Sequence, residues 1–320
     1  MRGRVQALVP RLLGALLAEA MLVCGACAGS ITVATYNVEN YVAADRRVDE
    51  VYRQGYPKPE AAKTALRAVI RALDADVLAL QEMGPAGYLE ELRSDLRAEG
   101  LDYPHMALAE AVDTDRHVAV LSRIPFCRVQ THADLDFRYF DGQTRVKRGL
   151  LEVVVAIDGR ELTLFAVHLR SRFTERPDDP NAAIFRAGEA TAIRDFVLRR
   201  FPNPAAARYV ILGDCNDTRN SKPLRLLTRR GTTTIATFTK AADPNGETWT
   251  YCYRKDDTYS RVDYVLVSPG LAAAVSEGGA RVYNGPGVRE ASDHRPVVVR
   301  LELPGSPSDA GPSGLPKKNG

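Results

Sequence analysis

The chain has 320 residues, with 43 Lys and Arg against 40 Asp and Glu, so its formal net charge is only +3. Hydrophobic residues make up 45% and charged residues 26% of the sequence, a composition that is typical of a globular protein and excludes a mainly disordered chain. Five cysteines are too few for a disulfide scaffold of this length, and collagen-like, fibrous and multi-span membrane proteins are excluded as well.

The first 28 residues have the features of a secretory signal peptide. Three arginines precede an apolar run over residues 12–23, which is shorter than the roughly 20 residues needed to span a bilayer. Ala26, Cys27 and Ala28 fit the small-x-small pattern before a cleavage site, so we expect an exported protein, periplasmic or extracellular, that starts at Gly29. The alternative is a bacterial lipoprotein signal with a lipid anchor on Cys27, although the usual leucine three places upstream is missing.

The rest of the chain divides into a body over residues 29–303 and a tail over residues 304–320. Gly, Pro and Ser dominate the tail, which predicts disorder there. The body contains no linker and no repeat, and its basic and acidic residues balance. A body without net charge is not attracted to nucleic acid as a whole, so any phosphate binding has to depend on a local cluster of basic residues.

Apolar runs typical of strands alternate with helical patterns along this body. Nearly continuous Val, Ile and Leu indicate strands that are covered on both faces, and Asp158-Gly159 between two such runs predicts a tight hairpin. Hairpins mixed with helices, without strict alternation, predict one domain in which sheets pack face to face with helices outside. The expected strands cover residues 31–36, 76–81, 117–121, 150–157, 162–169, 209–212, 262–267 and 296–301, and the expected helices cover residues 60–73, 89–96 and 181–201.

Polar residues gather where these predicted strands begin or end. Each group alone has a structural explanation: Glu82 could cap a helix, His168 could be a buried strand residue, and residues 213–217 could form a turn. Together they supply the carboxylates, asparagines and histidines that suit a hard divalent cation and acid–base chemistry. In chain order the groups read T-Y-N-V-E-N from Thr35, L-Q-E from Leu80, H-L from His168, G-D-C-N-D from Gly213, R-V-D-Y from Arg261 and S-D-H-R-P from Ser292.

This ordered set resembles the endonuclease/exonuclease/phosphatase superfamily of deoxyribonuclease-like, metal-dependent phosphoesterases. The motifs stand in the family's order and span Thr35 to Pro296, which is almost the whole body. The resemblance implies an α/β fold, namely a four-layer α/β/β/α sandwich of two mixed β-sheets flanked by helices. It places the site at one edge of the two sheets.

The resemblance also implies a metal site. Glu82 matches the family's principal metal-binding glutamate, Asn37 matches its partner from the first strand, and Asp293 lies near the metal. We expect Mg²⁺, with Mn²⁺ as a substitute, because Mg²⁺ keeps several waters and binds through few carboxylates. The ion would neutralise charge on the phosphoryl oxygens during hydrolysis.

The remaining motif residues match the family's catalytic groups. Asp214 and Asn216 match the pair that holds the phosphate and positions the nucleophile, and His168 matches a second histidine of several branches. His294 matches the final histidine, which Asp263 orients. Whether Asp214 or His294 accepts the proton of the attacking water stays open at this stage.

Several arginines could contact a substrate phosphate, namely Arg148, Arg170, Arg172, Arg186 and Arg261. Arg170 directly follows the H-L motif and is the first choice, with Arg148 as the second candidate. The alternative is that these side chains are solvated or paired with neighbouring acids.

We therefore expect an exported Mg²⁺-dependent phosphodiester hydrolase, most simply an endonuclease acting on DNA or RNA. The alternatives are an enzyme acting on a phospholipid, as a sphingomyelinase does, or on a small phosphoester. A non-catalytic binding module on the same scaffold is disfavoured because every metal and histidine position is filled. No protein partner is implied, and we expect a monomer.

Overall fold

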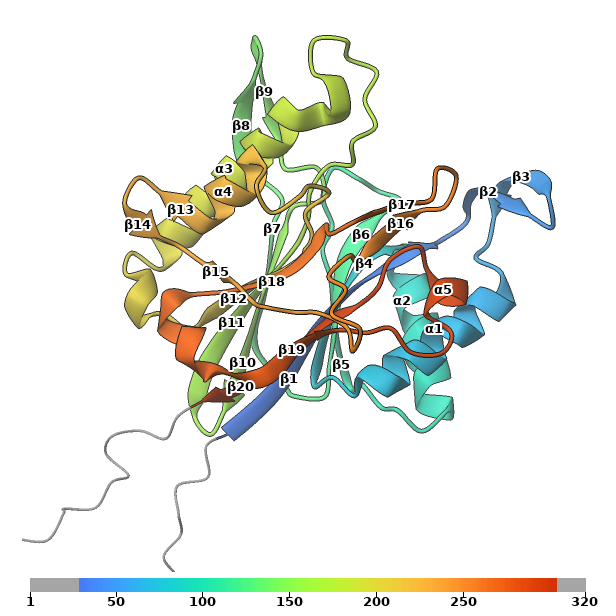
Figure 1. The fold of residues 1–320 in the computed structure, drawn as a ribbon, viewed down its shortest axis with the longest axis horizontal. Helices are drawn as coiled ribbons and strands as arrows, with labels where there is room; N and C mark the ends of the chain where they lie inside the picture. Colours follow the sequence, from blue (N-terminus) through green and yellow to red (C-terminus); the bar gives the residue numbers. More distant parts are fainter. Residues whose placement is uncertain (1–28, 304–320) are drawn as a thin grey trace, which may run out of the picture. The chain divides into compact units, whose positions relative to one another are not determined.

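Two six-stranded sheets packed face to face form the centre of the structure, a computed structural model that describes residues 29–303 (Figure 1). The predicted signal peptide over residues 1–28 and the predicted tail over residues 304–320 lie outside the described residues. The division of the chain at these boundaries therefore stays a prediction.

The first sheet has the strand order β19-β20-β1-β4-β6-β5. β1 and β4 are parallel, and every other neighbouring pair is antiparallel. The strands are β1 (Gly29–Tyr41), β4 (Val77–Met83), β5 (His105–Leu108), β6 (His117–Ser122), β19 (Val275–Val282) and β20 (Val297–Leu303).

The second sheet has the order β15-β18-β12-β11-β10-β7 and again contains one parallel pair, β11 with β12. The predicted hairpin joins β10 to β11, and Asp158 and Gly159 both have the positive φ that a primed two-residue turn requires. The strands are β7 (Phe126–His132), β10 (Leu150–Ile157), β11 (Arg160–His168), β12 (Tyr209–Asp214), β15 (Thr237–Phe238) and β18 (Asp263–Val267).

Helices cover the outer face of each sheet and complete the predicted four layers (Figure 1). α1 (Glu60–Leu73) and α2 (Ala86–Ala98) bury leucines against the first sheet, and α3 (Ala183–Arg200) and α4 (Lys222–Thr228) pack on the second. The short α5 (Val288–Ala291) lies against α1. No helix in this described part of the chain is long and apolar enough to cross a membrane.

Small hairpins and short 3₁₀ helices connect these layers. Their strands and helices are β2 (Ala44–Val48) with β3 (Val51–Tyr56), β8 (Asp136–Tyr139) with β9 (Gly142–Arg145), β13 (Arg229–Arg230) with β14 (Thr233–Thr234), β16 (Tyr251–Tyr253) with β17 (Thr258–Ser260), and η1 (Pro180–Ala182), η2 (Pro204–Ala206) and η3 (Pro269–Ala274).

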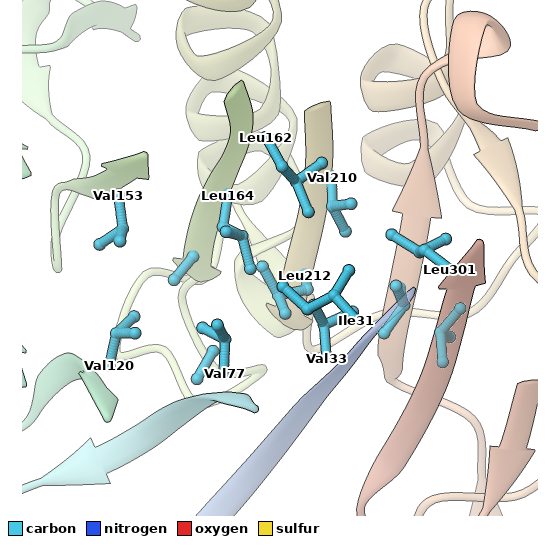
Figure 2. Close-up of a cluster of buried hydrophobic side chains, with 14 of the residues drawn as sticks. Ile31, Val33, Val77, Val120, Val153, Leu162, Leu164, Val210, Leu212 and Leu301 are labelled. Carbon is cyan, nitrogen blue, oxygen red and sulfur yellow. The ribbon is translucent and has the colours of Figure 1, made fainter. Parts of the chain in front are cut away.

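The core between the sheets is built by strand alternation. Ile31 and Val33 of β1 point toward Leu162 and Leu164 of β11 and Val210 of β12, as Figure 2 shows. Successive side chains of a strand point to opposite faces, so every second residue of these strands enters this core. Each fully buried aliphatic side chain contributes about 1.5–3 kcal/mol, which fixes the two sheets against each other.

Candidate active site at the edge of the two sheets

On each central strand, every second side chain points into the core between the sheets. At one edge of the sandwich the last residue of each such row is polar. The row of β1 that starts with Ile31 ends at Asn37, and the corresponding rows of β11, β12 and β18 end at His168, Asp214 and Asp263. His168 and Asp263 are both register partners of Asp214, so the three lie side by side. All four polar side chains are buried. The strand alternation that builds the core therefore also brings these four polar side chains together.

Asp214 is the centre of this cluster and joins the two sheets. Its Oδ2 accepts a hydrogen bond of 3.0 Å from Asn37 Nδ2, and its Oδ1 accepts one of 2.7 Å from the Asn216 backbone N–H. Asn216 Nδ2 also donates to Asp214 Oδ2 at 3.2 Å and to the Leu169 carbonyl at 2.9 Å. Burial, reinforced by the negative charge of Asp263, raises the pKa of the Asp214 carboxyl above its ordinary value.

Gly213 allows Asp214 to reach this position. Its φ is 145°, and a Cβ at this residue would collide with the carbonyl oxygen of Val167 in the neighbouring strand. Only glycine fits such a close approach of two backbones. The glycine of the G-D-C-N-D segment is thus explained by the packing of β12 on β11.

His294 and Asp263 form a buried acid–histidine pair. The His294 Nδ1 and Asp263 Oδ2 atoms are 2.8 Å apart. Burial alone would lower the pKa of His294, but the charge of Asp263 outweighs burial and raises this pKa well above its ordinary value. The Ser292 hydroxyl holds the backbone here: it accepts from the His294 backbone N–H at 3.0 Å and donates to the Asn37 carbonyl at 2.8 Å. His294 Nε2 lies 4.0 Å from Asp214 Oδ2, so the ring faces the central carboxylate.

His168 is a buried imidazole beside the same carboxylate. Its Nε2 is 3.5 Å from Asp214 Oδ2 without the geometry of a hydrogen bond, and neither ring nitrogen has a partner among the described residues. Burial, followed by the positive charge of Arg148, lowers the pKa of His168 well below its ordinary value. A buried imidazole that lacks partners can donate to or accept from a bound molecule.

Glu82 and Asp293 add carboxylates to the same edge. Glu82 has a φ of 62°, which breaks the alternation that would otherwise send it to the helix-covered face with Leu80, and its Oε2 accepts from the Asn40 N–H at 2.9 Å. Burial raises the pKa of the Asp293 carboxyl; the charge of His294 opposes this rise, whereas the charges of Glu39 and Glu82 add to it. These acids are close enough to repel one another, which favours the binding of a cation.

The structure adds charged residues that the sequence patterns missed. Lys58 is buried, its Nζ donates to the Glu39 carbonyl at 3.2 Å and lies 3.8 Å from Glu39 Oε2, and burial lowers its pKa. Arg116 Nε donates to Asn40 Oδ1 at 2.6 Å. Glu39 lies inside the T-Y-N-V-E-N segment and could have been found there, whereas Lys58 and Arg116 stand in segments without a motif.

The two predicted phosphate ligands have different surroundings. Arg148 is buried, and its guanidinium donates to Asp113 Oδ2 at 3.1 Å and to the Leu169 carbonyl at 3.2 Å, so it holds two loops together. The Arg170 guanidinium lies 4.8 Å from the centre of the Phe185 ring, and its side chain is partly exposed. Arg170 is therefore the better placed of the two to meet a ligand.

Two sets of ligand atoms could hold a divalent cation. One ligand atom from each of Asp214, Asp263 and His294 lies within 4.8 Å of the other two. The other set is the predicted one, Glu82 and Asp293 with Asn37, whose Oδ1 already accepts from the Glu39 N–H at 3.0 Å. Mg²⁺ prefers oxygen ligands; the predicted set offers oxygens alone, whereas the first set includes an imidazole nitrogen.

Comparison with known proteins gives one family for this chain. The sequence model described as the Endonuclease/Exonuclease/phosphatase family matches residues 34–294. No curated protein matches the chain by sequence.

Solved structures share the fold at low sequence identity. The catalytic domain of human nocturnin with a bound sulfate anion has a TM-score of 0.60 at 14% identity, covering 86% of this chain and 95% of that one. Sphingomyelinase C from Streptomyces griseocarneus gives 0.56 at 18% identity, covering 85% and 99%. D. rerio TDP2, humanized by 14 mutations, gives 0.56 at 15% identity, covering 85% and 98%. At these identities the likeness establishes the fold alone.

Proposed function

Because the chain belongs to the Endonuclease/Exonuclease/phosphatase family, we propose that it is an Mg²⁺-dependent phosphodiester hydrolase that cleaves DNA or RNA as an endonuclease. Members of this family are generally metal-dependent hydrolases of phosphoester bonds. The observation that carries the proposal is the buried His294–Asp263 pair; its second ring nitrogen, His294 Nε2, lies 4.0 Å from Asp214 Oδ2 and 3.9 Å from Asp293 Oδ1. A pair of this kind beside a carboxylate can move a proton and contact an anion at the same place.

In this proposal the two histidines and Asn216 hold the reacting phosphate. His294 is an imidazolium because Asp263 raises its pKa, so it stabilises negative charge on a phosphoryl oxygen. His168 is neutral and donates one N–H to another oxygen. Asp214, whose pKa is also raised, accepts the proton of the attacking water. The alternative gives this proton to His294, and the pH dependence of the Asp214→Asn and His294→Gln variants separates the two.

The residues present fit a divalent cation. Glu82, Asp293 and Asn37 offer oxygen ligands, and the negative charges of Glu39 and Glu82 add to the rise that burial causes in the pKa of Asp293. When bound there, Mg²⁺ or Mn²⁺ would supply positive charge to the phosphoryl oxygens. The three-residue set of Asp214, Asp263 and His294 is the alternative place for the ion. Calorimetric titration with Mn²⁺ decides between them, since Glu82→Gln should weaken binding in the first case and Asp263→Asn in the second.

A phospholipid is the second candidate substrate. Sphingomyelinase C shares the fold, and two aromatic side chains, Tyr52 at 64% and Phe173 at 74% exposure, stand out from the protein and could meet a lipid surface. Sulfate bound to nocturnin has the charge and shape of a phosphate group and fits either substrate class. The nucleic acid is favoured because the basic side chains of Arg172, Arg186 and Lys222 line a groove beside Asn216.

The test is a panel of substrates with the purified protein. Supercoiled plasmid, a single-stranded oligonucleotide, sphingomyelin vesicles and bis-(p-nitrophenyl) phosphate are each incubated with Mg²⁺, with Mn²⁺ and with chelator. Metal-dependent plasmid nicking that is lost in His294→Gln supports the proposal. Hydrolysis of the vesicles with no cleavage of either nucleic acid would contradict the proposal and identify a phospholipid as the substrate.

We also propose that the protein is exported, as a monomer without a protein partner, after cleavage behind Ala28. β1 begins at Gly29, so cleavage there would leave every described strand intact. Expression in a bacterium with a secretory system, followed by mass spectrometry of the mature N-terminus, tests this. A start at Gly29 supports export, a lipidated Cys27 supports the lipid anchor, and an intact Met1 contradicts both.

A further inference from the structure

A cationic groove lies next to the candidate active site. It has a volume of about 480 Å³, which is within the range of ligand-binding pockets. Its polar lining consists of Arg172, Asn181, Arg186, Asp217, Ser221 and Lys222. None of these residues belongs to the catalytic groups assigned above.

The topology explains why the groove adjoins the site. One wall comes from the segment between β11 and α3, and the other comes from the segment between β12 and α4. β11 and β12 are parallel neighbours, and α3 and α4 lie side by side (Figure 1). Both segments therefore leave from the same edge of the sheet as His168 and Asp214, where ligands commonly bind in parallel sheets.

Hydrogen bonds connect the groove to the backbone of Asn216 and of Arg170. Arg172 Nε donates to the Asn216 carbonyl at 3.3 Å, and Arg186 Nη1 donates to the Arg170 carbonyl at 3.4 Å. If the reacting phosphate of a polymeric substrate lies at Asn216, the neighbouring residue of that polymer would therefore enter this groove.

The groove keeps a positive charge. Asp217 is its one carboxylate; its Oδ2 accepts from Arg186 Nε at 3.1 Å, and its Oδ1 lies 3.8 Å from Arg172 Nη2. The Arg186 side chain is 2% exposed and also donates to the Asn181 carbonyl at 2.6 Å, so this cation is fixed in place. Lys222 is exposed on the first turn of α4. Three cations against one anion leave a surplus that an anionic ligand would neutralise.

We propose that this groove binds the phosphodiester adjacent to the one being hydrolysed, on the same nucleic acid strand. This inference rests on the proposed function and names a second phosphate site for it. A polynucleotide repeats its phosphate along the chain, whereas a sphingomyelin headgroup continues from its single phosphate into a cation that this groove would repel. Cleavage should therefore depend on the length of the strand and on ionic strength.

Lys222 is the residue to change, because its side chain is exposed and lies at the start of a helix, where substitution leaves the core untouched. Lys222→Gln removes the charge and Lys222→Glu reverses it. Arg208→Gln is the matched control, since Arg208 is an exposed cation just before β12, at the opposite edge of the sheet from the catalytic residues.

The full chain and its variants are compared on a dinucleotide, which has one phosphodiester, and on a single-stranded 8-mer. We expect the ratio of kcat/KM for the 8-mer to that for the dinucleotide to fall roughly threefold to tenfold in Lys222→Gln and further in Lys222→Glu. The slope of log KM for the 8-mer against log salt concentration should decrease by about 0.7 in Lys222→Gln, as one lost phosphate contact on a single strand predicts. Arg208→Gln should behave as the wild type.

An unchanged ratio and salt slope in Lys222→Glu would overturn the second phosphate site while leaving the nuclease function standing. An equal loss in Arg208→Gln would overturn it too, since a general charge effect would then explain the result. If the wild type hydrolyses sphingomyelin vesicles but cleaves neither oligonucleotide with Mg²⁺ or Mn²⁺, the proposed function fails, and the groove proposal fails with it.

Discussion

Replacing Asp263 with asparagine keeps the size of the side chain and removes the charge that holds His294. Asp263 is buried, its Oδ2 is 2.8 Å from His294 Nδ1, and its charge is what raises the pKa of this histidine against the effect of burial. Without that charge the ring loses its fixed tautomer and its positive charge. General acid–base groups contribute about 10²–10⁴ in rate, so we expect kcat to fall by that factor, or roughly 3–5.5 kcal/mol of transition-state stabilisation.

The assay is single-strand cleavage at saturating Mg²⁺, with thermal unfolding measured in parallel. The backbone should stay in place because the Thr250 hydroxyl accepts from the Val262 and Asp263 N–H groups, at 3.0 Å each. Asp102→Asn, in the exposed loop between α2 and β5, is the matched control and should retain full activity. If Asp263→Asn is folded and keeps more than about a tenth of the wild-type kcat, the acid–histidine pair does not do what we infer.

Three further predictions concern the metal, the backbone and pH. Glu82→Gln should raise the Mg²⁺ concentration needed for half-maximal cleavage at least about tenfold, and an unchanged requirement would place the ion elsewhere. Gly213→Ala should destabilise the fold by about 2–4 kcal/mol in urea unfolding, because its Cβ would collide with the Val167 carbonyl oxygen; wild-type stability would refute this. Burial raises the pKa of Glu152, but the hydrogen bond from His132 and the charge of Arg128 outweigh it, so the net pKa is lowered. Its stabilising effect is present above the pKa of the unfolded chain and is lost as pH falls through the lowered value, so the Tm difference between wild type and Glu152→Gln should shrink with acidification, and a constant difference would contradict this.

Strand alternation and the family resemblance together predicted the layers, and alternation also indicates which polar residues lie at one edge of the sheets. Period-two alternation marks which residues of a strand face the core, and polar residues at the ends of such rows have to lie at the edge of the sheet. Asn37, His168, Asp214 and Asp263 follow this rule, and the structure brings them together. The family resemblance supplied the pairing of the two sheets, which alternation alone does not specify.

Other parts of the site depend on contacts that no local pattern encodes. The left-handed backbone of Glu82 reverses the direction that alternation would give its side chain. Lys58 and Arg116 reach the site from loops distant in sequence, through Glu39 and Asn40. Arg148 was a candidate for a phosphate contact, but a sequence does not show that Asp113, 35 residues away, binds its guanidinium.

Cleavage of supercoiled plasmid by wild type and His294→Gln, with Mg²⁺ and with chelator, tests the central claim most directly. We predict that the wild type converts the plasmid to the nicked form with Mg²⁺ alone, and that chelator or His294→Gln abolishes this. Nicking that persists in a folded His294→Gln variant, or no nicking by the wild type with Mg²⁺ or Mn²⁺, would contradict the account.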